Sequence, residues 1–565
     1  MATGAATALA AAMLTVHASG ASAFEESTAE VDGAVLTELA ASGTAEFFVY
    51  LDERADLAPV SALSDRTARA QFVYDQLTSV AAASQAGVTA LLERHGAEFT
   101  PFWITNAILV EGDRALLDLL AAHPDVSSIG PNGTLPLIEP VESAPADNTI
   151  QSVEWGVANI NADDVWADFG VTGEGIVVAT IDTGVQYDHP ALVAQYRGNL
   201  GGGSFDHNYN WHDPSEVCSP GVPCDNNGHG THVTGTMVGD DGGNNQIGVA
   251  PGAQWIAAKG CESNSCSQSA LLSSGQWMVA PTDVNGDNPD PSKAPHIVNN
   301  SWGGGGGNTW YMDTVDSWVA AGIFPMFANG NSGPGCGTAG SPGDYPQSYG
   351  IGAYDESNNI ASFSSRGPSQ VDSGIKPNAS APGVSVRSSV PTNSYSSFSG
   401  TSMASPHASG LVALVWSAES SLVGDIDATR AIVDSTSRSE SDLQCGGDAD
   451  NNNVWGQGRI DAHAAVSAAL GQDPPDDPPD DPPADLVADF TWDCPGSGGQ
   501  RTCTFDGGPS IGDIVSWDWH FDDGNATGSG EVVTHTYQGG RARDVTLTVT
   551  DVDGETDPVT QTVRP

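Results

Sequence analysis

Three short segments of the chain place a reactive side chain close to glycines, where the backbone can approach a partner tightly. They are GIVVATIDTGV with Asp182, NGHGTHVTGTMVG with His229, and SSFSGTSMASPHASGLVALV with Ser402. A serine hydroxyl is a poor nucleophile at neutral pH and needs an adjacent base to take its proton. An Asp, a His and a Ser brought together could therefore perform acyl transfer through a covalent serine intermediate.

Each of these residues also has an ordinary structural explanation. An Asp at a strand end is usually a turn or cap residue, and a Ser that opens a helix is usually an N-cap. Asp182 follows an apolar strand, so its carboxylate would emerge where ligand sites of open α/β sheets lie. His232, three residues after His229, is predicted to be structural. The joint occurrence in the order Asp, His, Ser favours catalysis over three separate structural roles.

The segments DTGV, HGTHVTG and GTSMASPH resemble the three signature motifs of the subtilisin-like serine peptidases. The stretches EWGVANINADDVW, QIGVAPGAQWIAAK and APHIVNNSWGGG are most similar to bacillopeptidase F-type members of that family. The resemblance covers about residues 150 to 470. It implies a serine endopeptidase that needs no cofactor for its chemistry.

The resemblance also implies a role for each side chain. His229 would be the general base, and Asp182 would fix its tautomer and stabilise the imidazolium. Ser402 would be the nucleophile, at a helix N-terminus that favours negative charge. Asn331, in FANGNSG, would form the oxyanion hole together with the backbone N–H of Ser402.

The substrate groove is implied by the same resemblance. Substrate would bind as an extended strand against sheet-edge backbone, which makes recognition broad. The groove is predicted to include Ser301, Trp302 and Gly303. The primary specificity pocket is predicted to run from Ala328 to Gly330, with Gly340 opposite. Such a pocket has room for a large apolar side chain. No acidic residue is evident at its base, so trypsin-like specificity is not indicated.

A structural calcium ion is a further candidate. The family often carries a calcium loop after the catalytic-His helix, but GDDGGNNQIGVAPG looks too short to supply it. The segment DVNGDNPD offers oxygen ligands at alternating spacing instead. These ligands would be Asp283, Asn285, Asp287 and Asp290. The alternative is a solvated Asp/Asn loop, which is ordinary in so acidic a chain.

The order of patterns along the chain predicts three folded parts. Residues 45–140 alternate in the order β-α-β-β-α-β, a ferredoxin-like layout that is similar in pattern to the family's inhibitory propeptide. From about Trp155 to Leu470, continuous apolar runs such as GIVVATID predict a parallel sheet covered on both faces. QDPPDDPPDDPPA predicts an extended spacer. The short β-like runs beyond it predict a β-sandwich and resemble a PKD-type domain, with WHFDDG in place of the usual WDFGDG.

The predicted fold class is therefore α/β: a subtilisin-like parallel sheet with helices on both faces, preceded by an α+β ferredoxin-like propeptide and followed by a small β-sandwich. The predicted boundaries are a signal peptide at 1–23, an inhibitory propeptide at 24–147, a peptidase domain at 148–471, a Pro/Asp linker at 472–484 and a PKD-type domain at 485–565.

The charge balance limits the possible partners. The formal net charge is −53, from 71 acidic and 18 basic residues. Nucleic acid and anionic membrane surfaces are therefore excluded as partners. An acid-rich, lysine-poor surface repels itself at low ionic strength, which favours adaptation to a saline habitat. The alternative is that many extracellular bacterial proteins are simply acidic.

The N-terminus and the cysteines indicate export. An apolar stretch from Ala5 to Val16 is followed by Ala21-Ser22-Ala23, as in a signal peptide, although no Lys or Arg precedes it. No later run reaches 18 apolar residues, so the mature protein is expected to be secreted, extracellular and soluble. The even cysteine count favours disulfides over zinc. The close pairs are Cys218/Cys224, Cys261/Cys266 and Cys494/Cys503, which leaves Cys336 and Cys445 to pair by elimination.

Other functions remain open at this stage. The rival of a different class is a catalytically silent surface protein whose β-sandwich binds a polymer or matrix, but no triad residue is lost. The terminal domain could be a spacer, or it could grip a polymer through Trp492, Trp517 or Trp519. A narrow processing protease is an alternative to a degradative one. The expected partners are protein or peptide substrates and the chain's own propeptide as inhibitor, and a monomer is expected.

Overall fold

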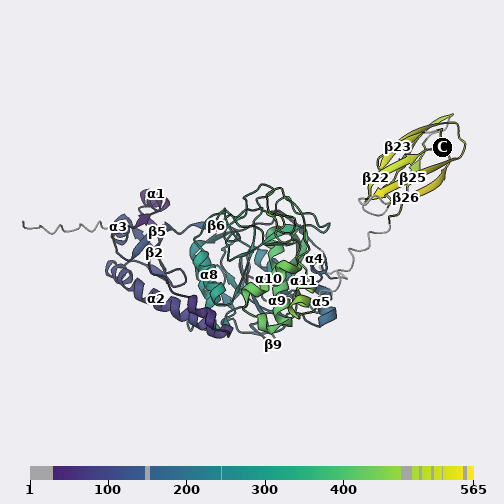
Figure 1. Cartoon of the computed structure of the whole chain (residues 1–565). Coiled ribbons are helices and arrows are strands. Elements are labelled where there is room, and N and C mark those ends of the chain that lie inside the picture. The colour runs from purple at the N-terminus through teal and green to yellow at the C-terminus, as the bar shows by residue number, and fades with distance from the viewer. Residues whose placement is uncertain are drawn as a thin grey trace, which may run out of the picture. The chain divides into compact units, whose positions relative to one another are not determined.

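A computed structural model describes most of the chain. The described residues are 29–146, 153–243, 245–472, 486–495, 499–510, 514–524, 526–551 and 556–565. The predicted signal peptide, the predicted boundary at 147/148 and, apart from Gln472, the predicted linker lie outside them. The chain divides into two compact units, Met1–Gln472 and Asp473–Pro565. The first unit contains a small N-terminal domain and a larger α/β domain (Figure 1).

The N-terminal domain has the predicted β-α-β-β-α-β order. Its elements are β2 (Thr44–Leu51), α2 (Arg66–His95), β3 (Phe99–Phe102), β4 (Ala107–Asp113), α3 (Arg114–Ala121) and β5 (Val126–Pro131). A short strand β1 (Glu30–Val31) and a helix α1 (Gly33–Ser42) precede them, and the sheet order is β1-β5-β2-β4-β3. Aspartates accept a backbone hydrogen bond at the start of α1, α2 and α3: Asp32, Asp65 and Asp113. These caps explain why the helices begin where they do.

Helix α2 is shared between two hydrophobic cores. Its second half packs Val88 and Leu92 against the N-terminal sheet. Its first half places Val73 and Leu77 in a core that also contains Trp318 of the larger domain. The two domains of the first unit are therefore joined by continuous apolar packing.

The larger domain is built on a seven-stranded sheet in the order β11-β12-β8-β14-β15-β16-β17. The strands are β8 (Val177–Asp182), β11 (Trp211–His212), β12 (Gln254–Lys259), β14 (Ile297–Asn300), β15 (Phe324–Ala328), β16 (Tyr349–Tyr354) and β17 (Ala379–Pro382). All neighbouring strands are parallel. The predicted parallel sheet is thus confirmed, and its continuous apolar strands are explained by burial on both faces.

Helices cover both faces of this sheet. One face carries α4 (Trp155–Asn159), α5 (Ala162–Phe169), α6 (His229–Val238), α9 (Thr401–Ala418), α10 (Ile426–Thr436) and α11 (Ala462–Ala469). The other face carries α7 (Gln268–Val279) and α8 (Met312–Ala320). Smaller strands lie outside the sheet: β6 (Thr134–Pro136), β7 (Glu142–Pro145), β9 (Asn199–Gly201), β10 (Ser204–Phe205), β13 (Ser265–Ser267), β18 (Val386–Val390) and β19 (Ser394–Ser399).

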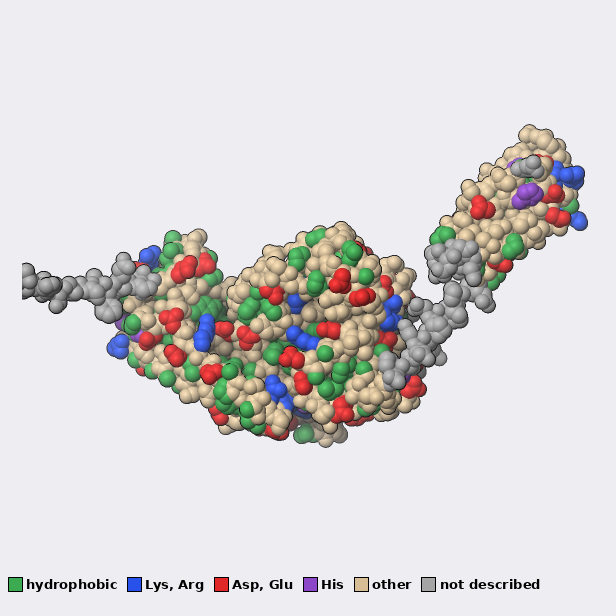
Figure 2. All heavy atoms as spheres, viewed as in Figure 1, with side chains coloured by type: hydrophobic (Ala, Val, Ile, Leu, Met, Phe, Trp, Pro, Cys, Tyr) green, Lys and Arg blue, Asp and Glu red, His purple; other side chains and the backbone are tan. Residues whose placement is uncertain are grey.

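All eight cysteines form disulfides. The bonds join Cys218 to Cys224, Cys261 to Cys266, Cys336 to Cys445 and Cys494 to Cys503. The three close pairs and the pair reached by elimination are thereby confirmed. On the face that Figure 2 shows, the acidic side chains of the described residues are scattered. None of the helices in the described residues has the length and apolar character to cross a bilayer.

The C-terminal unit has two antiparallel sheets. One contains β20 (Thr491–Asp493), β21 (Gln500–Asp506) and β24 (Val532–Gln538), and the other contains β22 (Ile514–His520), β23 (Thr527–Ser529), β25 (Arg543–Asp551) and β26 (Thr556–Val563). Phe505 and Leu547 of the two sheets share one core. Trp519 belongs to that core and donates to Gly530 O, whereas Trp492 is 37% exposed. Of these two, Trp492 alone is available to a partner.

The separate cores predict independent stability. A chain that ends at Gln472 is expected to keep the unfolding transition of the first unit within about 2 °C, because its core needs no residue of the second unit. Differential scanning calorimetry of the full and truncated chains measures this directly. A lower melting temperature in the truncated chain would mean that the second unit stabilises the first.

Candidate active site

Asp182 and His229 form a buried hydrogen-bonded pair. Asp182 is the last residue of β8 and His229 the first of α6, and Oδ1 of Asp182 lies 2.8 Å from Nδ1 of His229. Both side chains are almost completely buried. A carboxylate on Nδ1 holds the proton there, so Nε2 becomes the basic nitrogen. Nε2 of His229 is buried and has no hydrogen-bond partner in the described residues, so its lone pair is available.

The glycine after His229 allows this close approach. A Cβ at Gly230 would lie 2.2 Å from the carbonyl oxygen of Gly184 and 3.1 Å from Cβ of Asp182. No other residue fits there without moving the backbone. The local motif around His229 is therefore explained by the contact between the start of α6 and the end of β8.

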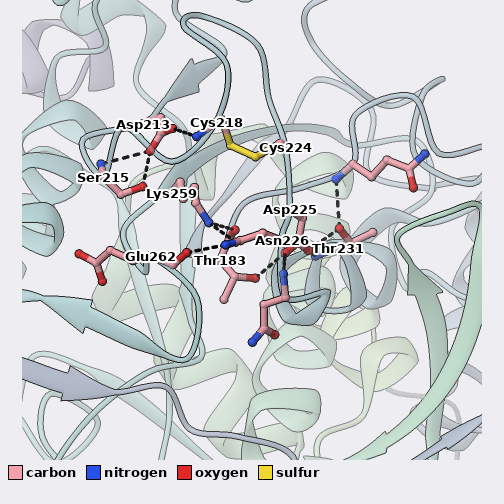
Figure 3. The surroundings of a disulfide bond; sticks show 12 residues. Thr183, Asp213, Ser215, Cys218, Cys224, Asp225, Asn226, Thr231, Lys259 and Glu262 are labelled. Carbon is pink, nitrogen blue, oxygen red and sulfur yellow. Dashed lines mark hydrogen bonds between the residues drawn. A yellow bond between two sulfur atoms is a disulfide. The ribbon is translucent and has the colours of Figure 1, made fainter.

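A hydrogen-bonded frame supports the Asp182 end of β8. Thr183 donates its N–H to Oδ1 of Asp182 at 2.8 Å. Its hydroxyl donates to Asp225, which also accepts from the N–H and the hydroxyl of Thr231 in α6. Asp225 therefore joins the end of β8 to α6 (Figure 3).

Lys259 adds a buried cation to the same frame. It is the last residue of β12, and its Nζ donates to Thr183 O at 2.5 Å and to Asn226 Oδ1 at 2.7 Å. Figure 3 shows it between these two partners. Burial lowers the pKa of Lys259, and the nearby carboxylates, Asp225 first, act in the opposite direction. This lysine was not singled out from the sequence, because a lone Lys at a strand end has no distinctive pattern.

His232 has a structural role, as predicted. Its Nε2 lies 3.0 Å from Val386 O, and its ring stacks on Phe398 with 4.3 Å between centroids. Burial lowers the pKa of His232 to about 3, with a further contribution from His229. His232 therefore stays neutral at ordinary pH.

Ser402 and Asn331 lie next to each other at the start of α9. Oδ1 of Asn331 accepts from both the N–H and the hydroxyl of Thr401, each at 2.9 Å. These bonds fix the amide so that Nδ2 points outward, where it donates to Glu139 O at 3.2 Å. The hydroxyl of Ser402 donates to Ile138 O at 2.9 Å. Both predicted residues thus touch the backbone of one short segment.

That segment is the connector between the two domains of the first unit. Before Ile138, β6 pairs with β13, and Leu137 forms a bridge with Trp302. After it, β7 pairs antiparallel with β19, and Val141 N donates to Ser399 O at 2.7 Å. The connector therefore lies in the site as an extended strand that is held on both sides.

The connector bulges between its two paired stretches. Glu139 N donates to Leu137 O at 2.8 Å, which turns the chain tightly at this point. As a result, Ser402 contacts the carbonyl of Ile138 while Asn331 contacts the next carbonyl, that of Glu139. Ser402 and Asn331 therefore donate to the carbonyls of two successive peptide units.

The predicted groove residues lie along the connector, and the predicted pocket residues lie against one another. Ser301 Oγ donates to Ser402 O at 3.0 Å, and a Cβ at Gly303 would lie 3.5 Å from Cδ1 of Ile138. Gly340 N donates to Asn329 O, which brings Gly340 against the segment Ala328–Gly330. A side chain at Gly340 would meet Gly304 O at 2.5 Å. Gly303 therefore leaves room beside Ile138, whereas Gly340 allows the close approach of Gly304 and Asn329.

The N-terminal domain is also anchored away from the groove. Arg69 donates to the carbonyls of Val319 and Ala320, the last two residues of α8, each at 3.1 Å. Arg66 donates to Gly322 O at 3.0 Å and to Pro295 O. Carbonyls at a helix C-terminus carry partial negative charge, so guanidinium groups are stabilised there. Burial lowers the pKa of Arg66 to about 10, a value at which it remains charged at neutral pH.

The carboxylates of Asp283 and Asp290, two of the predicted calcium ligands, accept hydrogen bonds from their own loop. The Asp283 carboxylate accepts from Asn285 N, Asp287 N and Asn288 Nδ2, and the Asp290 carboxylate accepts from Ser292. These oxygens stabilise the turns of their own loop, which is the alternative that the sequence left open. No cluster of three or more His, Cys, Asp or Glu suited to a metal occurs within the described ranges.

Two family profiles match the chain. The subtilase family profile matches residues 173–458, and the PKD domain profile matches residues 488–564. Bacillopeptidase F of Bacillus subtilis (strain 168) is 42% identical over 382 residues, which are 65% of this chain and 26% of that protein. Subtilisin DY of Bacillus licheniformis is 36% identical over 270 residues, 47% of this chain and 85% of that protein. The chain thus spans about a quarter of the first relative and most of the second.

Proposed function

The chain belongs to the subtilase family of serine peptidases, and on this premise we propose that it is a secreted endopeptidase made as a self-inhibited precursor. The observation that carries the proposal is the position of Ser402 and Asn331 on the backbone of a strand-like segment of the same chain. The strand pairing on both sides of this segment supports binding of a peptide in extended form.

The proposed chemistry uses the Asp182–His229 pair and Ser402, whose hydroxyl here donates to Ile138 O and to Ser301 O and must turn to His229 for the reaction. His229 takes the proton of Ser402 through Nε2, and Oγ attacks the carbonyl carbon of the substrate. Asp182 stabilises the imidazolium that forms. The tetrahedral oxyanion accepts hydrogen bonds from Nδ2 of Asn331 and from the N–H of Ser402. His229 then gives its proton to the leaving amine, and water hydrolyses the acyl-enzyme.

The N-terminal domain is the proposed inhibitor. Its connector fills the groove, α2 shares a core with the larger domain, and Arg66 and Arg69 bind carbonyls near the end of α8. These contacts are spread over one continuous interface, so the domain would remain bound after a single peptide bond is cut. Inhibition would end when the domain is degraded.

The proposed site of self-cleavage is the Ile138–Glu139 bond. The hydroxyl of Ser402 donates to the carbonyl of Ile138, and Asn331, which here donates to the carbonyl of Glu139, would have to move to Ile138 O as the oxyanion forms. The next bond, Glu139–Pro140, would require a proline nitrogen as leaving group, and that tertiary amide is conformationally restricted. Ile138 lies beside Gly303, which supports a preference for apolar residues before the scissile bond.

The C-terminal PKD domain is proposed as an accessory binding module for a polymer or matrix. The exposed indole of Trp492 on β20 supports this role, because aromatic rings supply large contact areas. The domain's core, which includes Trp519, needs no partner for its own stability.

Export and salt adaptation complete the proposal. Four disulfides favour an oxidising compartment. The net charge of −53 gives strong self-repulsion that counterions screen over about 10 Å at 0.1 M salt.

The oxyanion role predicts the effect of changing Asn331. Asn331→Leu is expected to lower kcat by about 10²- to 10³-fold with a small change in KM, because the lost bond matters mainly after the oxyanion forms. Steady-state hydrolysis of a chromogenic peptide measures both constants. The exposed Asn285→Leu is the matched control and should leave them unchanged. Normal turnover in Asn331→Leu would assign the oxyanion hole elsewhere.

The self-cleavage proposal predicts two results from one substitution. Ser402→Ala should abolish peptide hydrolysis and leave the precursor uncut, whereas the parent chain should release a fragment that ends at Ile138. Expression in a protease-deficient host followed by intact mass spectrometry detects both species, with the exposed Ser421→Ala as control. Maturation of the Ser402→Ala variant would refute self-processing, and a fragment ending at another residue would refute the proposed bond.

The acidic surface predicts a salt-dependent stability. The melting temperature should rise between dilute buffer and about 2 M sodium chloride, because counterions relieve repulsion among carboxylates. Sucrose at equal osmolality is the control, since it stabilises without screening charge. If salt and sucrose raise the melting temperature equally, charge screening is not the cause and the chain is not salt-adapted.

A further inference from the structure

We propose that the disulfide Cys261–Cys266 and the side chain of Glu262 are positioning elements that hold β13 as a preformed edge for substrate. This edge would bind the residues that precede the scissile bond, and so it would determine affinity for extended substrates. The inference rests on the proposed peptidase function.

The segment that carries β13, residues 260–267, begins next to the end of β8. It follows β12 directly, and Cys261 N donates to Asp182 O at 3.1 Å. The sulfur of Cys266, five residues later, is bonded to that of Cys261, and both side chains are completely buried. The disulfide therefore links the substrate-facing strand covalently to a residue whose backbone is fixed against Asp182.

Glu262 holds the same segment through hydrogen bonds. Its N–H donates to Ser265 O at 2.9 Å, and its carboxylate accepts from the hydroxyl of Ser267 at 2.7 Å. Its carbonyl accepts from Nδ2 of Asn226 at 2.9 Å, a contact visible in Figure 3. Ser267 also accepts from Ala270 N and so caps α7. Both ends of β13 are thus fixed to the body of the domain.

Within the described residues, β13 pairs only with the connector. In the described residues, β13 has one strand partner, β6, with Cys266 opposite Leu135. The carbonyl oxygen of Asn264, which precedes β13, accepts from Leu137 N at 3.0 Å. Once the connector leaves, no strand of the described part of the chain remains beside β13 to keep it extended. The disulfide and Glu262 would then maintain its conformation.

A preformed edge lowers the cost of binding. If β13 were mobile in the free enzyme, each bound peptide would have to order it again, and that entropy would be lost from the affinity. The effect is confined to residues 134–137 of the connector, because Ile138 lies instead beside Gly303. Only substrates that reach β13 should therefore depend on the disulfide.

The test compares a long and a short substrate. The long one is a p-nitroanilide with Thr-Leu-Pro-Leu-Ile before the scissile bond, the sequence of residues 134–138. The short one is an N-acetyl-Ile p-nitrophenyl ester. In Cys261→Ser/Cys266→Ser, the ratio of kcat/KM for the long substrate to that for the short one is expected to fall at least about tenfold, mainly through KM.

Two further variants make the result decisive. Cys494→Ser/Cys503→Ser removes a disulfide of the other unit and should leave the ratio unchanged. Glu262→Ala keeps the disulfide and should lower the ratio in the same direction by a smaller factor, and it carries the test if the double serine variant does not mature. Titration with a sulfonyl fluoride counts the active sites, so partial unfolding lowers both substrates equally and leaves the ratio intact.

An unchanged ratio in the Cys261/Cys266 and Glu262 variants would overturn the positioning role. Inactivity of the parent enzyme on both substrates would instead refute the proposed peptidase function. The two failures are therefore distinguishable.

Discussion

The buried carboxylate of Asp182 is the constraint on which the rest of the site depends. A carboxylate without exposure to water must be compensated by hydrogen bonds and neighbouring charge. Here the imidazole of His229 and the N–H of Thr183 bind it directly. Around them lie Asp225 and Lys259, which join β8 to α6 and to β12. The geometry of the reactive pair is thus set by the packing of three elements rather than by a flexible loop.

The same constraint explains which features the sequence could predict. Asp182, His229 and Ser402 each lie at or next to the end of a long buried element, and the apolar runs and glycines of those elements are visible without coordinates. The parallel sheet followed from the same runs, although not its number of strands, and the pairing of Cys336 with Cys445 followed by elimination.

Features made of short or polar segments were not predictable. Strands β13 and β19 are rich in serine and have no alternating apolar pattern, so their pairing with the connector had no signal. The side chains of the 283–290 loop have the spacing of calcium ligands, yet spacing does not reveal that the carboxylates of Asp283 and Asp290 turn toward their own backbone. The bulge at Glu139 lies between the two paired stretches of the connector, and neither pairing has a signal in the sequence.

Helix α2 has a consequence for the order of assembly. Its first half completes a core whose other members include residues of α7 and α8, far later in the chain. During synthesis the N-terminal domain emerges first and can fold early, so this half of α2 would offer an apolar template to the larger domain. If the N-terminal domain is removed as proposed, that template cannot be regained, and the larger domain would persist because its unfolding is slow rather than because refolding is efficient.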